Sequence, residues 1–503
     1  MGFSTVDIII ILLYMVVSTT LGAWIGRKQK STDDYFLGGR RIPWGAVLFS
    51  IVATETSVLT FISVPAISYL GTMTFLQMTL GYMLGRIVIA VVMLPVYFRS
   101  ELKTAYHYLG ERFGPSMRRL ASCVFMGTRL LADGVRLFAA AIPLTIILKS
   151  STLFSAFADG QLYAVSIVFI GLLTIIYTYI GGIRSVIWMD VVQMAIYVGG
   201  AFFAAIFILI RLPDGMETVF QSAASDNKFR WFDLGASLTL KEFIQQPYTF
   251  CTALFAGALF SLASHGTDQI IVQRLLSCKN LTAARKAICW SGVAVFLQFL
   301  LFLVIGVMLF AYYQGAALED LGLTRADGIF PKFIVEELPV GISGLIVAAL
   351  FAAAMSTLSS SLSSLSSATV LDIYIPLSGE GKTDAQLLKI SKWVTLIWGV
   401  ALVGVALAFI QFTGTVIEVA LGVASYTYGG LLGSFFLGLL SKRVRERDGI
   451  IGFACALLGM VVVTQRVNLA WPLYTFIGAT ITIGVGLFSS RFNFPSQDEK
   501  ENA

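Results

Sequence analysis

The stretch Leu162–Ile180, LYAVSIVFIGLLTIIYTYI, contains no charged residue. As a helix it has about the length needed to cross the hydrocarbon core of a bilayer, which takes about 20 apolar residues. Similar runs occur at Val6–Ile25 and Val191–Ile210, and no segment between such runs is long enough for a sizeable soluble domain. The chain is therefore predicted to be an all-α polytopic membrane protein.

The composition of the 503-residue chain supports this prediction. Hydrophobic residues make up 57% of the chain and charged residues 13%, with a mean hydropathy of +0.83. This leaves too little polar surface for a water-soluble globule, so we expect the lipid bilayer as its surroundings. The net charge of +6 comes from basic residues in short loops beside the apolar runs, which is typical of membrane topology, and we expect no nucleic-acid partner.

Hydropathy and turn residues together predict about 13 transmembrane helices. Their expected ranges are 6–26, 44–70, 74–98, 119–148, 160–181, 186–212, 248–273, 283–314, 339–371, 387–411, 415–440, 448–465 and 470–490. Basic segments flank several of these ranges, at Arg27–Arg41, Arg99–Arg119, Arg274–Lys286 and Lys442–Arg447. The most basic loops should face the cytoplasm, which places the N-terminus outside the plasma membrane and the C-terminus inside.

Two polar patches interrupt apolar runs at corresponding places. They are Ala53–Ser57 (ATETS) and Ser261–Asp268 (SLASHGTD), and each opens a block of five predicted helices. Two related halves with broken helices are typical of secondary transporters. We therefore expect one transporter domain over residues 1–503, with a first repeat at 44–212, a second at 248–440 and additional C-terminal helices at 448–490.

The segment Ala352–Ser367, AAAMSTLSSSLSSLSS, carries hydroxyl groups at helical three-and-four spacing. One interpretation is a small-residue face that allows close helix packing in lipid. The other is a row of oxygen ligands for an ion, since a helix supplies such ligands as hydroxyl groups and as carbonyl groups freed at a break. The spacing alone leaves both interpretations open.

Ionisable residues inside apolar helices are a further signal, because they are unfavourable in lipid and usually have a functional partner. Asp190 begins an otherwise apolar helix and is either a counter-charge for a cation or an interfacial residue exposed to water. Glu55 should face the protein interior. Arg129, Asp133 and Arg136 share one helix face, where they form either a salt-bridge cluster or part of a solute site.

Five motifs in the same order along nearly the whole chain resemble those of the sodium:solute symporter family, which includes sodium-coupled sugar, proline, sialic acid, monocarboxylate and vitamin carriers. They are KSTDDYFLGGRRIPWG at Lys30–Gly45, ATETSVLTFISVPA at Ala53–Ala66, YTYIGGIRSVIWMDVVQ at Tyr177–Gln193, GTDQIIVQRLLSCKN at Gly266–Asn280, and AAAMSTLSSSLSSLSSATVLDIY at Ala352–Tyr374. The resemblance implies a LeuT-like fold with a five-plus-five inverted repeat.

The resemblance also implies the ligands of the sodium ion that serves as the coupling ion. The first sodium site is expected between the broken second helix and the ninth helix, at Ala53, Thr56, Ala353, Ser356 and Thr357. Members with a second site build it from the sixth and ninth helices, which here corresponds to Asp190, Ser356, Ser359 and Ser360. We accordingly expect two sodium ions for each solute.

The solute pocket is expected at positions where the sugar and sialic acid branches carry different polar side chains from those found here. The predicted pocket residues are Thr60, Phe75, Gln77, Thr79, Ser261 and Ser264, with Arg136 as an anchor for a carboxylate. The expected solute is a small organic molecule, namely a monocarboxylate, a vitamin-like acid, a sugar or an amino acid.

Taken together, the motifs predict a sodium-coupled symporter that imports a small organic solute by alternating access. The alternative is a membrane-embedded solute sensor of the same fold. An ion channel would show a pore-loop filter, and an enzyme would need a nucleophile, a base or a metal cluster, for which two histidines give little support. We expect a single chain to be sufficient for function.

Overall fold

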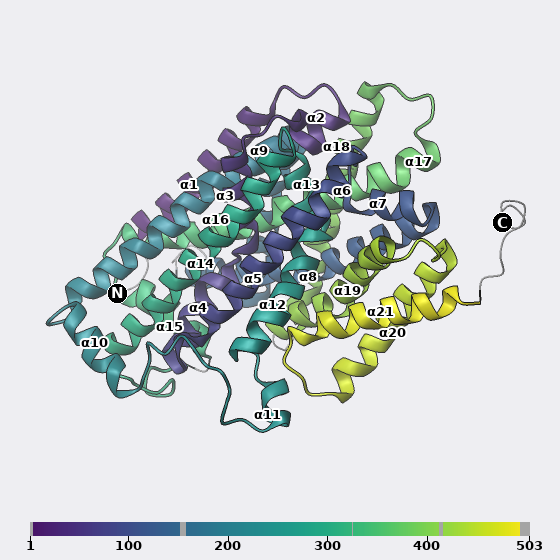
Figure 1. Cartoon of the computed structure of the whole chain (residues 1–503). Coiled ribbons are helices and arrows are strands. Elements are labelled where there is room, and N and C mark those ends of the chain that lie inside the picture. Colours follow the sequence, from purple (N-terminus) through teal and green to yellow (C-terminus); the bar gives the residue numbers. More distant parts are fainter. Residues whose placement is uncertain (1–3, 151–156, 324, 412–415, 493–503) are drawn as a thin grey trace, which may run out of the picture.

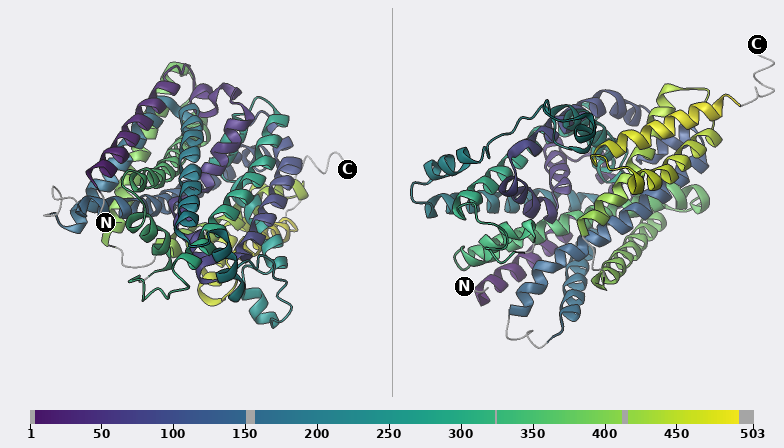
Figure 2. Two further views of the ribbon diagram at one scale, coloured as in Figure 1. Left: turned by 90° about the vertical axis from the view of Figure 1, so that its left-hand side faces the viewer. Right: turned by 90° about the horizontal axis from the view of Figure 1, so that it is seen from below.

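The computed structural model describes residues 4–150, 157–323, 325–411 and 416–492, which form helices and no β-strand (Figure 1). The long helices lie side by side in one elongated bundle (Figure 2). Their bounds are α1 Thr5–Gly26, α2 Thr32–Leu37, α3 Trp44–Glu55, α4 Val58–Leu70, α5 Leu76–Val88, α6 Leu94–Arg99, α7 Ala105–Arg112, α8 Pro115–Ser150, α9 Asp159–Arg211, α10 Met216–Ser225, α11 Leu240–Gln245, α12 Phe250–Gly266, α13 Gln269–Leu276, α14 Leu281–Tyr312, α15 Ile329–Glu336, α16 Ile342–Ser367, α17 Ile375–Ser378, α18 Asp384–Ala408, α19 Val416–Leu440, α20 Glu446–Arg466 and α21 Leu473–Ser490.

Within the described residues, nine helical runs are long and apolar enough to cross a membrane, or ten if the bent pair α3–α4 counts as one span. The predicted all-α membrane architecture is therefore confirmed. The number 13 stays a prediction. The predicted ranges 160–181 and 186–212 both lie within α9, which is two helices that meet at a kink at Gly182, where φ is 52° and ψ is −156°. Glycine allows that positive φ without a steric penalty.

Both polar patches lie at breaks between consecutive helices. The α3 and α4 segments are bent by 63° relative to each other. The second break separates α12 from α13, where the Asp268 side chain caps α13 by accepting a hydrogen bond from the backbone amide of Ile270 at 3.0 Å. A polar side chain that caps a new helix favours a break over a continuous helix. The two predicted breaks are confirmed, while the repeat boundaries stay a prediction.

Helices α5 and α12 pack very closely because α5 carries glycine on the facing side. A Cβ atom added to Gly81 would lie 2.4 Å from the carbonyl oxygen of Ala253, and one added to Gly85 would lie 2.8 Å from the Cβ atom of Ser261. Neither position has room for a larger side chain. Small residues of this kind allow the close helix contacts typical of membrane proteins.

The four basic segments gather at one end of the bundle, near α2 and α7 in Figure 1. Hydrogen bonds at this end include Arg40 to the carbonyl of Glu101 at 3.1 Å and Arg112 to the carbonyl of Val444 at 3.3 Å. The amide of Ile42, next to the first segment, donates to the carbonyl of Ser277 at 3.2 Å. The start of α1 lies at the opposite end, near α10 and α15.

Candidate functional site

The break between α3 and α4 lies against α16. Thr56 and Ser57 have extended backbone conformations, with ψ of 106° and 173°, so helical hydrogen bonding stops there. The hydroxyl of Thr54, at the end of α3, lies 3.3 Å from the hydroxyl of Ser360 on α16. Carbonyl groups at a broken helix, close to hydroxyl groups of a second helix, are the hard oxygen atoms that a sodium ion prefers.

The five residues predicted for the first sodium site are all buried, on the α3–α4 break and on α16. The hydroxyl of Thr357 donates to the carbonyl oxygen of Ala353 at 3.1 Å. The hydroxyl of Thr56 accepts a hydrogen bond from the side-chain amide of Gln298 on α14. Ala53, near the end of α3, is 1% exposed. The sodium role of this group stays a prediction.

The four residues predicted for the second sodium site lie together. The Ser356 hydroxyl donates to the carboxylate of Asp190 at 2.6 Å, which joins α16 to α9. The hydroxyls of Ser359 and Ser360 donate to the carbonyl oxygen of Ser356 at 3.1 and 2.6 Å. Asp190 is fully buried, so the interpretation of this residue as a water-exposed interfacial group is wrong.

A side chain that the sequence did not single out, Arg274 on α13, binds the same carboxylate. Its guanidinium lies 3.0 Å from Asp190, and it also donates to the hydroxyls of Ser50 and Ser360. Ser50 in turn donates to Asp190. The carboxylate therefore accepts hydrogen bonds from two serines and one arginine, all of them buried. Its negative charge is already balanced by one cation within the protein.

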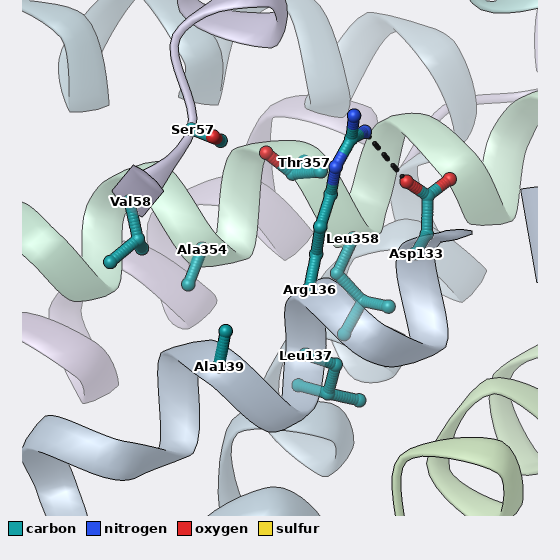
Figure 3. A pocket seen from close by; sticks show the side chains of 9 residues that line it. All are labelled: Ser57, Val58, Asp133, Arg136, Leu137, Ala139, Ala354, Thr357 and Leu358. Carbon is teal, nitrogen blue, oxygen red and sulfur yellow. Dashed lines mark hydrogen bonds and ion pairs between the residues drawn. The ribbon is translucent and has the colours of Figure 1, made fainter. Parts of the chain in front are cut away.

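A small cavity of about 10 Å³ lies between the helix break, α8 and α16, and Figure 3 shows its lining. The hydroxyls of Ser57 and Thr357 and the guanidinium of Arg136 extend into the same region. The volume is enough for about one water molecule and far below the several hundred Å³ of a typical small-molecule pocket. An organic solute would enter only if the helices around the cavity move apart.

Arg136, whose side chain is 31% exposed, belongs to an ionic network with Arg129 and Asp133, with which it shares one face of α8. It donates to the carboxylate of Asp133 at 2.8 Å, and Arg129 lies 3.7 Å from the same carboxylate. Arg129 also pairs with Asp268 at the α12–α13 break and donates to the hydroxyl of Tyr428 on α19 at 2.9 Å. The predicted salt-bridge cluster is confirmed, and it connects α8 to the second helix break.

The other residues of the predicted solute pocket lie outside the lining of this cavity. On α4 and near the start of α5, the Thr60 hydroxyl accepts from the Ser57 amide at 3.4 Å, Phe75 stacks on Phe299 with ring centroids 5.2 Å apart, and Thr79 donates to the carbonyl of Leu76 at 2.7 Å. Their part in solute binding stays a prediction.

Gln77 has a connecting role in this structure. Its side-chain amide donates to the carbonyl of Tyr248 at 2.7 Å and its carbonyl accepts from the amide of Asp233 at 3.2 Å, so it holds the segment between α10 and α12. On α12, the Ser261 hydroxyl donates to the carbonyl of Tyr82 at 3.2 Å, and Ser264 to that of Phe260 at 2.9 Å.

A second ion-paired cluster lies beside the first break. The carboxylate of Glu55 pairs with Arg86 on α5 and lies 3.4 Å from the ring of His265 on α12. Arg86 is fully buried and also donates to the hydroxyl of Ser291 at 3.1 Å. Glu55 is 15% exposed, so the prediction that it faces the protein interior is confirmed. Glu55 and its neighbour His265 both lie in the polar patches that interrupt apolar runs, whereas Arg86 lies outside these patches.

Comparison with known proteins places this geometry in a family context. Residues 35–459 match the model of the sodium:solute symporter family. The chain is 29% identical to a sodium/sialic acid symporter of Proteus mirabilis, over 98% of this chain and 97% of that protein. It is 28% identical to the human sodium/iodide cotransporter, over 95% of this chain and 71% of that protein.

Solved structures give the same result. A sodium-coupled sialic acid symporter, in a substrate-bound outward-open state described as revealing a novel sodium site, matches with a TM-score of 0.84 at 28% identity, over 98% of this chain and 99% of that one. A transporter of the nucleobase-cation-symport-1 family matches with a TM-score of 0.54 at 14% identity, covering 93% of this chain and 97% of that one, which indicates a shared fold.

Proposed function

Because the chain belongs to the sodium:solute symporter family, we propose that the α3–α4 break, α9 and α16 bind its sodium ions and that its solute is an organic anion. The protein is a multi-pass, LeuT-like, sodium-coupled symporter that moves a small organic solute by alternating access. The observation that carries the proposal is the contact of Ser356 with Asp190 at 2.6 Å, because it joins the two predicted sodium sites.

The first sodium ion is bound by the carbonyl oxygens of Ala53, Thr56 and Ala353 with the hydroxyls of Ser356 and Thr357. The extended backbone at Thr56 supports this assignment, because a break frees carbonyl oxygens for an ion. If the α3–α4 break moved away from α16, the sodium ion would lose the ligands of one of the two elements. Sodium binding would therefore favour the conformation in which α3 and α16 are in contact.

The second sodium ion is bound by Asp190 with the hydroxyls of Ser356, Ser359 and Ser360. A carboxylate favours a cation more strongly than neutral hydroxyl groups do, and burial strengthens the interaction. Ser356 takes part in both sites, so occupancy of one site would affect the other.

The solute is recognised by the guanidinium of Arg136 at the small cavity between the helix break, α8 and α16. Arg136 is the guanidinium on the lining of this cavity, and Ser57 and Thr357 provide hydroxyl groups beside it. A guanidinium binds a carboxylate through two parallel hydrogen bonds. The two relatives named above carry sialic acid and iodide, both of them anions. The remaining residues of the pocket predicted from the sequence would contribute once the helices move apart.

The basic end of the bundle faces the cytoplasm under the positive-inside rule. The start of α1 lies at the other end, where Asp7 accepts hydrogen bonds from the amides of Gly341 and Gly344 at 2.7 and 2.8 Å. This orientation puts the N-terminus outside and the end of α21 inside the cell. We also propose that the protein functions as a monomer in the lipid bilayer.

The test is a thermal-unfolding screen of purified protein against carboxylates including sialic acid, neutral sugars, amino acids and vitamins, each in sodium and in potassium. A carboxylate should raise the unfolding temperature in sodium only. Arg136→Ala should abolish that shift and leave the sodium-only shift in place. Stabilisation by a neutral sugar that persists in Arg136→Ala would refute the assignment of an anionic solute.

A further inference from the structure

Arg274 is buried at the proposed second sodium site but is not one of the proposed sodium ligands. Arg274 and Asp190 both have fully buried side chains, 3.0 Å apart. The arginine comes from α13, directly after the second helix break, while the aspartate lies on α9. The ion pair therefore joins elements from the two predicted repeats.

Arg274 contacts two of the four proposed ligands of the second sodium ion. Its Nη2 atom donates to the carboxylate of Asp190 and to the hydroxyl of Ser360. The Ser360 hydroxyl uses its own proton in a bond to the Ser356 carbonyl at 2.6 Å, so its lone pairs are what a cation would use. The Arg274 guanidinium already donates to this hydroxyl oxygen, so it uses a lone pair that a cation would need.

The charges make simultaneous binding unfavourable. The Asp190–Arg274 pair is neutral and shielded from water, and a sodium ion placed on the same carboxylate would lie beside a second full positive charge. Like charges at this distance repel strongly in a buried, weakly polarisable environment. Sodium gains the full attraction of Asp190 only when the guanidinium withdraws.

We propose that Arg274 is a tethered cation that competes with sodium for Asp190 and Ser360. This inference rests on the proposed second sodium site. When sodium binds, Arg274 leaves these two ligands and keeps the Ser50 hydroxyl at 2.8 Å and the carbonyl of Ile270, on its own helix, at 2.7 Å. When sodium leaves, the arginine returns and the carboxylate is never buried without a counter-charge.

The exchange has a mechanical consequence. The bonds from Arg274 to Asp190 and Ser360 attach α13 to α9 and α16. Sodium would release this attachment, so occupancy of the ion site would control how firmly α13 is held. Binding that favours one arrangement of a helix over another is what couples an ion to a conformational change.

The alternative role for Arg274 is to orient Asp190 as a sodium ligand, and the two roles predict opposite effects. If Arg274 competes, Arg274→Gln removes the rival charge and lowers the half-saturating sodium concentration by about tenfold, a typical size for coupled sites. If Arg274 orients the carboxylate, the same variant weakens sodium binding.

The experiment measures sodium-dependent thermal unfolding, with potassium as the reference ion, for wild type, Arg274→Gln and Arg274→Lys. Arg274→Gln should be less stable than wild type in potassium, because Asp190 loses its buried partner, and should gain more from sodium. Arg274→Lys keeps the charge but lacks the planar fork, so its half-saturating concentration should lie between the other two.

Two controls complete the design. Arg118→Gln also breaks an ion pair with a buried carboxylate, Asp372, but should leave the half-saturating sodium concentration unchanged. Asp190→Asn combined with Arg274→Gln removes both charges and should lose the gain seen in Arg274→Gln alone.

An unchanged or raised half-saturating concentration in Arg274→Gln overturns the competition. If that variant does not fold, the same comparison of Arg274→Lys with wild type decides the question. The second sodium site fails separately, and the competition with it, if Asp190→Asn binds sodium as wild type does. Weaker sodium binding in both Asp190→Asn and Arg274→Gln leaves the site in place and overturns the competition alone.

Discussion

Substitution of Ser356 gives the most direct test of the sodium assignment, because this residue belongs to both proposed sites. Ser356→Ala removes a hydroxyl that donates to a buried carboxylate at 2.6 Å. Hydrogen bonds to charged groups contribute about 1.5–3 kcal/mol, and 1.4 kcal/mol is about tenfold in an equilibrium constant. The half-saturating sodium concentration should therefore rise by about tenfold to 100-fold.

Thr357→Ala should have a smaller effect. The hydroxyl of Thr357 donates to the neutral carbonyl of Ala353 at 3.1 Å and belongs to the first site alone. A neutral hydrogen bond contributes about 0.5–1.5 kcal/mol, which corresponds to a rise of about twofold to tenfold in half-saturating sodium. We therefore predict a higher half-saturating sodium concentration for Ser356→Ala than for Thr357→Ala.

The assay is solute uptake into proteoliposomes as sodium is titrated, supported by thermal unfolding in sodium and in potassium. Ser364→Ala is the matched control, since this hydroxyl is equally buried on α16 but donates to the carbonyl of Ser361 on its own helix at 3.1 Å. It should behave as wild type. If Ser356→Ala and Ser364→Ala give the same sodium dependence, the serine row serves helix packing and the sodium assignment is wrong.

Four further predictions follow from the structure. Asp190→Asn should reduce the Hill coefficient for sodium uptake from above one towards one, and a wild-type coefficient of one with a one-to-one flux ratio would exclude the second ion. Glu55→Gln should change transport or its pH profile, because Arg86 loses its buried counter-charge, whereas an unaltered rate and profile would remove Glu55 from the cycle. Arg136→Lys should retain carboxylate binding more weakly than wild type, since an ammonium lacks the paired donors of a guanidinium, and equal affinity in isothermal titration would contradict the proposed anchor. Burial, with the nearby charges of Arg118 and Lys103, lowers the pKa of His107 in α7 to about 4. The folded protein should therefore lose stability as the pH falls from about 6.5 to about 4. His107→Gln should show a shallower fall in unfolding temperature, and an identical fall would refute the pKa argument.

Much of the fold was accessible from the sequence because membrane insertion imposes a simple rule on it. Apolar runs near 20 residues predicted the long helices, and the polar patches predicted both breaks, since a segment with competing side-chain hydrogen bonds does not continue a helix. The count of spans was less accessible. The predicted ranges 160–181 and 186–212 lie on either side of the kink at Gly182, but hydropathy alone does not determine how many of the apolar runs cross the membrane.

Spacing along the chain indicated which residues share a helix face, and the family resemblance implied the sodium ligands, but neither indicated contacts between distant helices. Ser356, Ser359 and Ser360 share a face of α16 because of their spacing, and Asp190 stood out as a charge at the start of an apolar helix. Arg274 stood inside a recognised motif, but its partner lies 84 residues away on another helix. Contacts of that kind depend on how helices pack, which spacing within one helix does not determine.

Ion pairs across the bundle explain why the second sodium ion would bind fully only after an arginine side chain moves. Five acidic side chains of the interior each pair with a different arginine, at Glu55–Arg86, Asp133–Arg136, Asp190–Arg274, Asp268–Arg129 and Asp372–Arg118. Each pair is neutral, so an entering cation finds no unbalanced carboxylate among these five. At the proposed second site, sodium gains the attraction of Asp190 only by displacing Arg274, and the free energy gained is limited by the ion pair that it breaks. The displaced arginine changes how α13 is attached to α9 and α16. Asp190–Arg274 is the pair that binds Ser356 and Ser360, two of the proposed ligands of the second sodium ion.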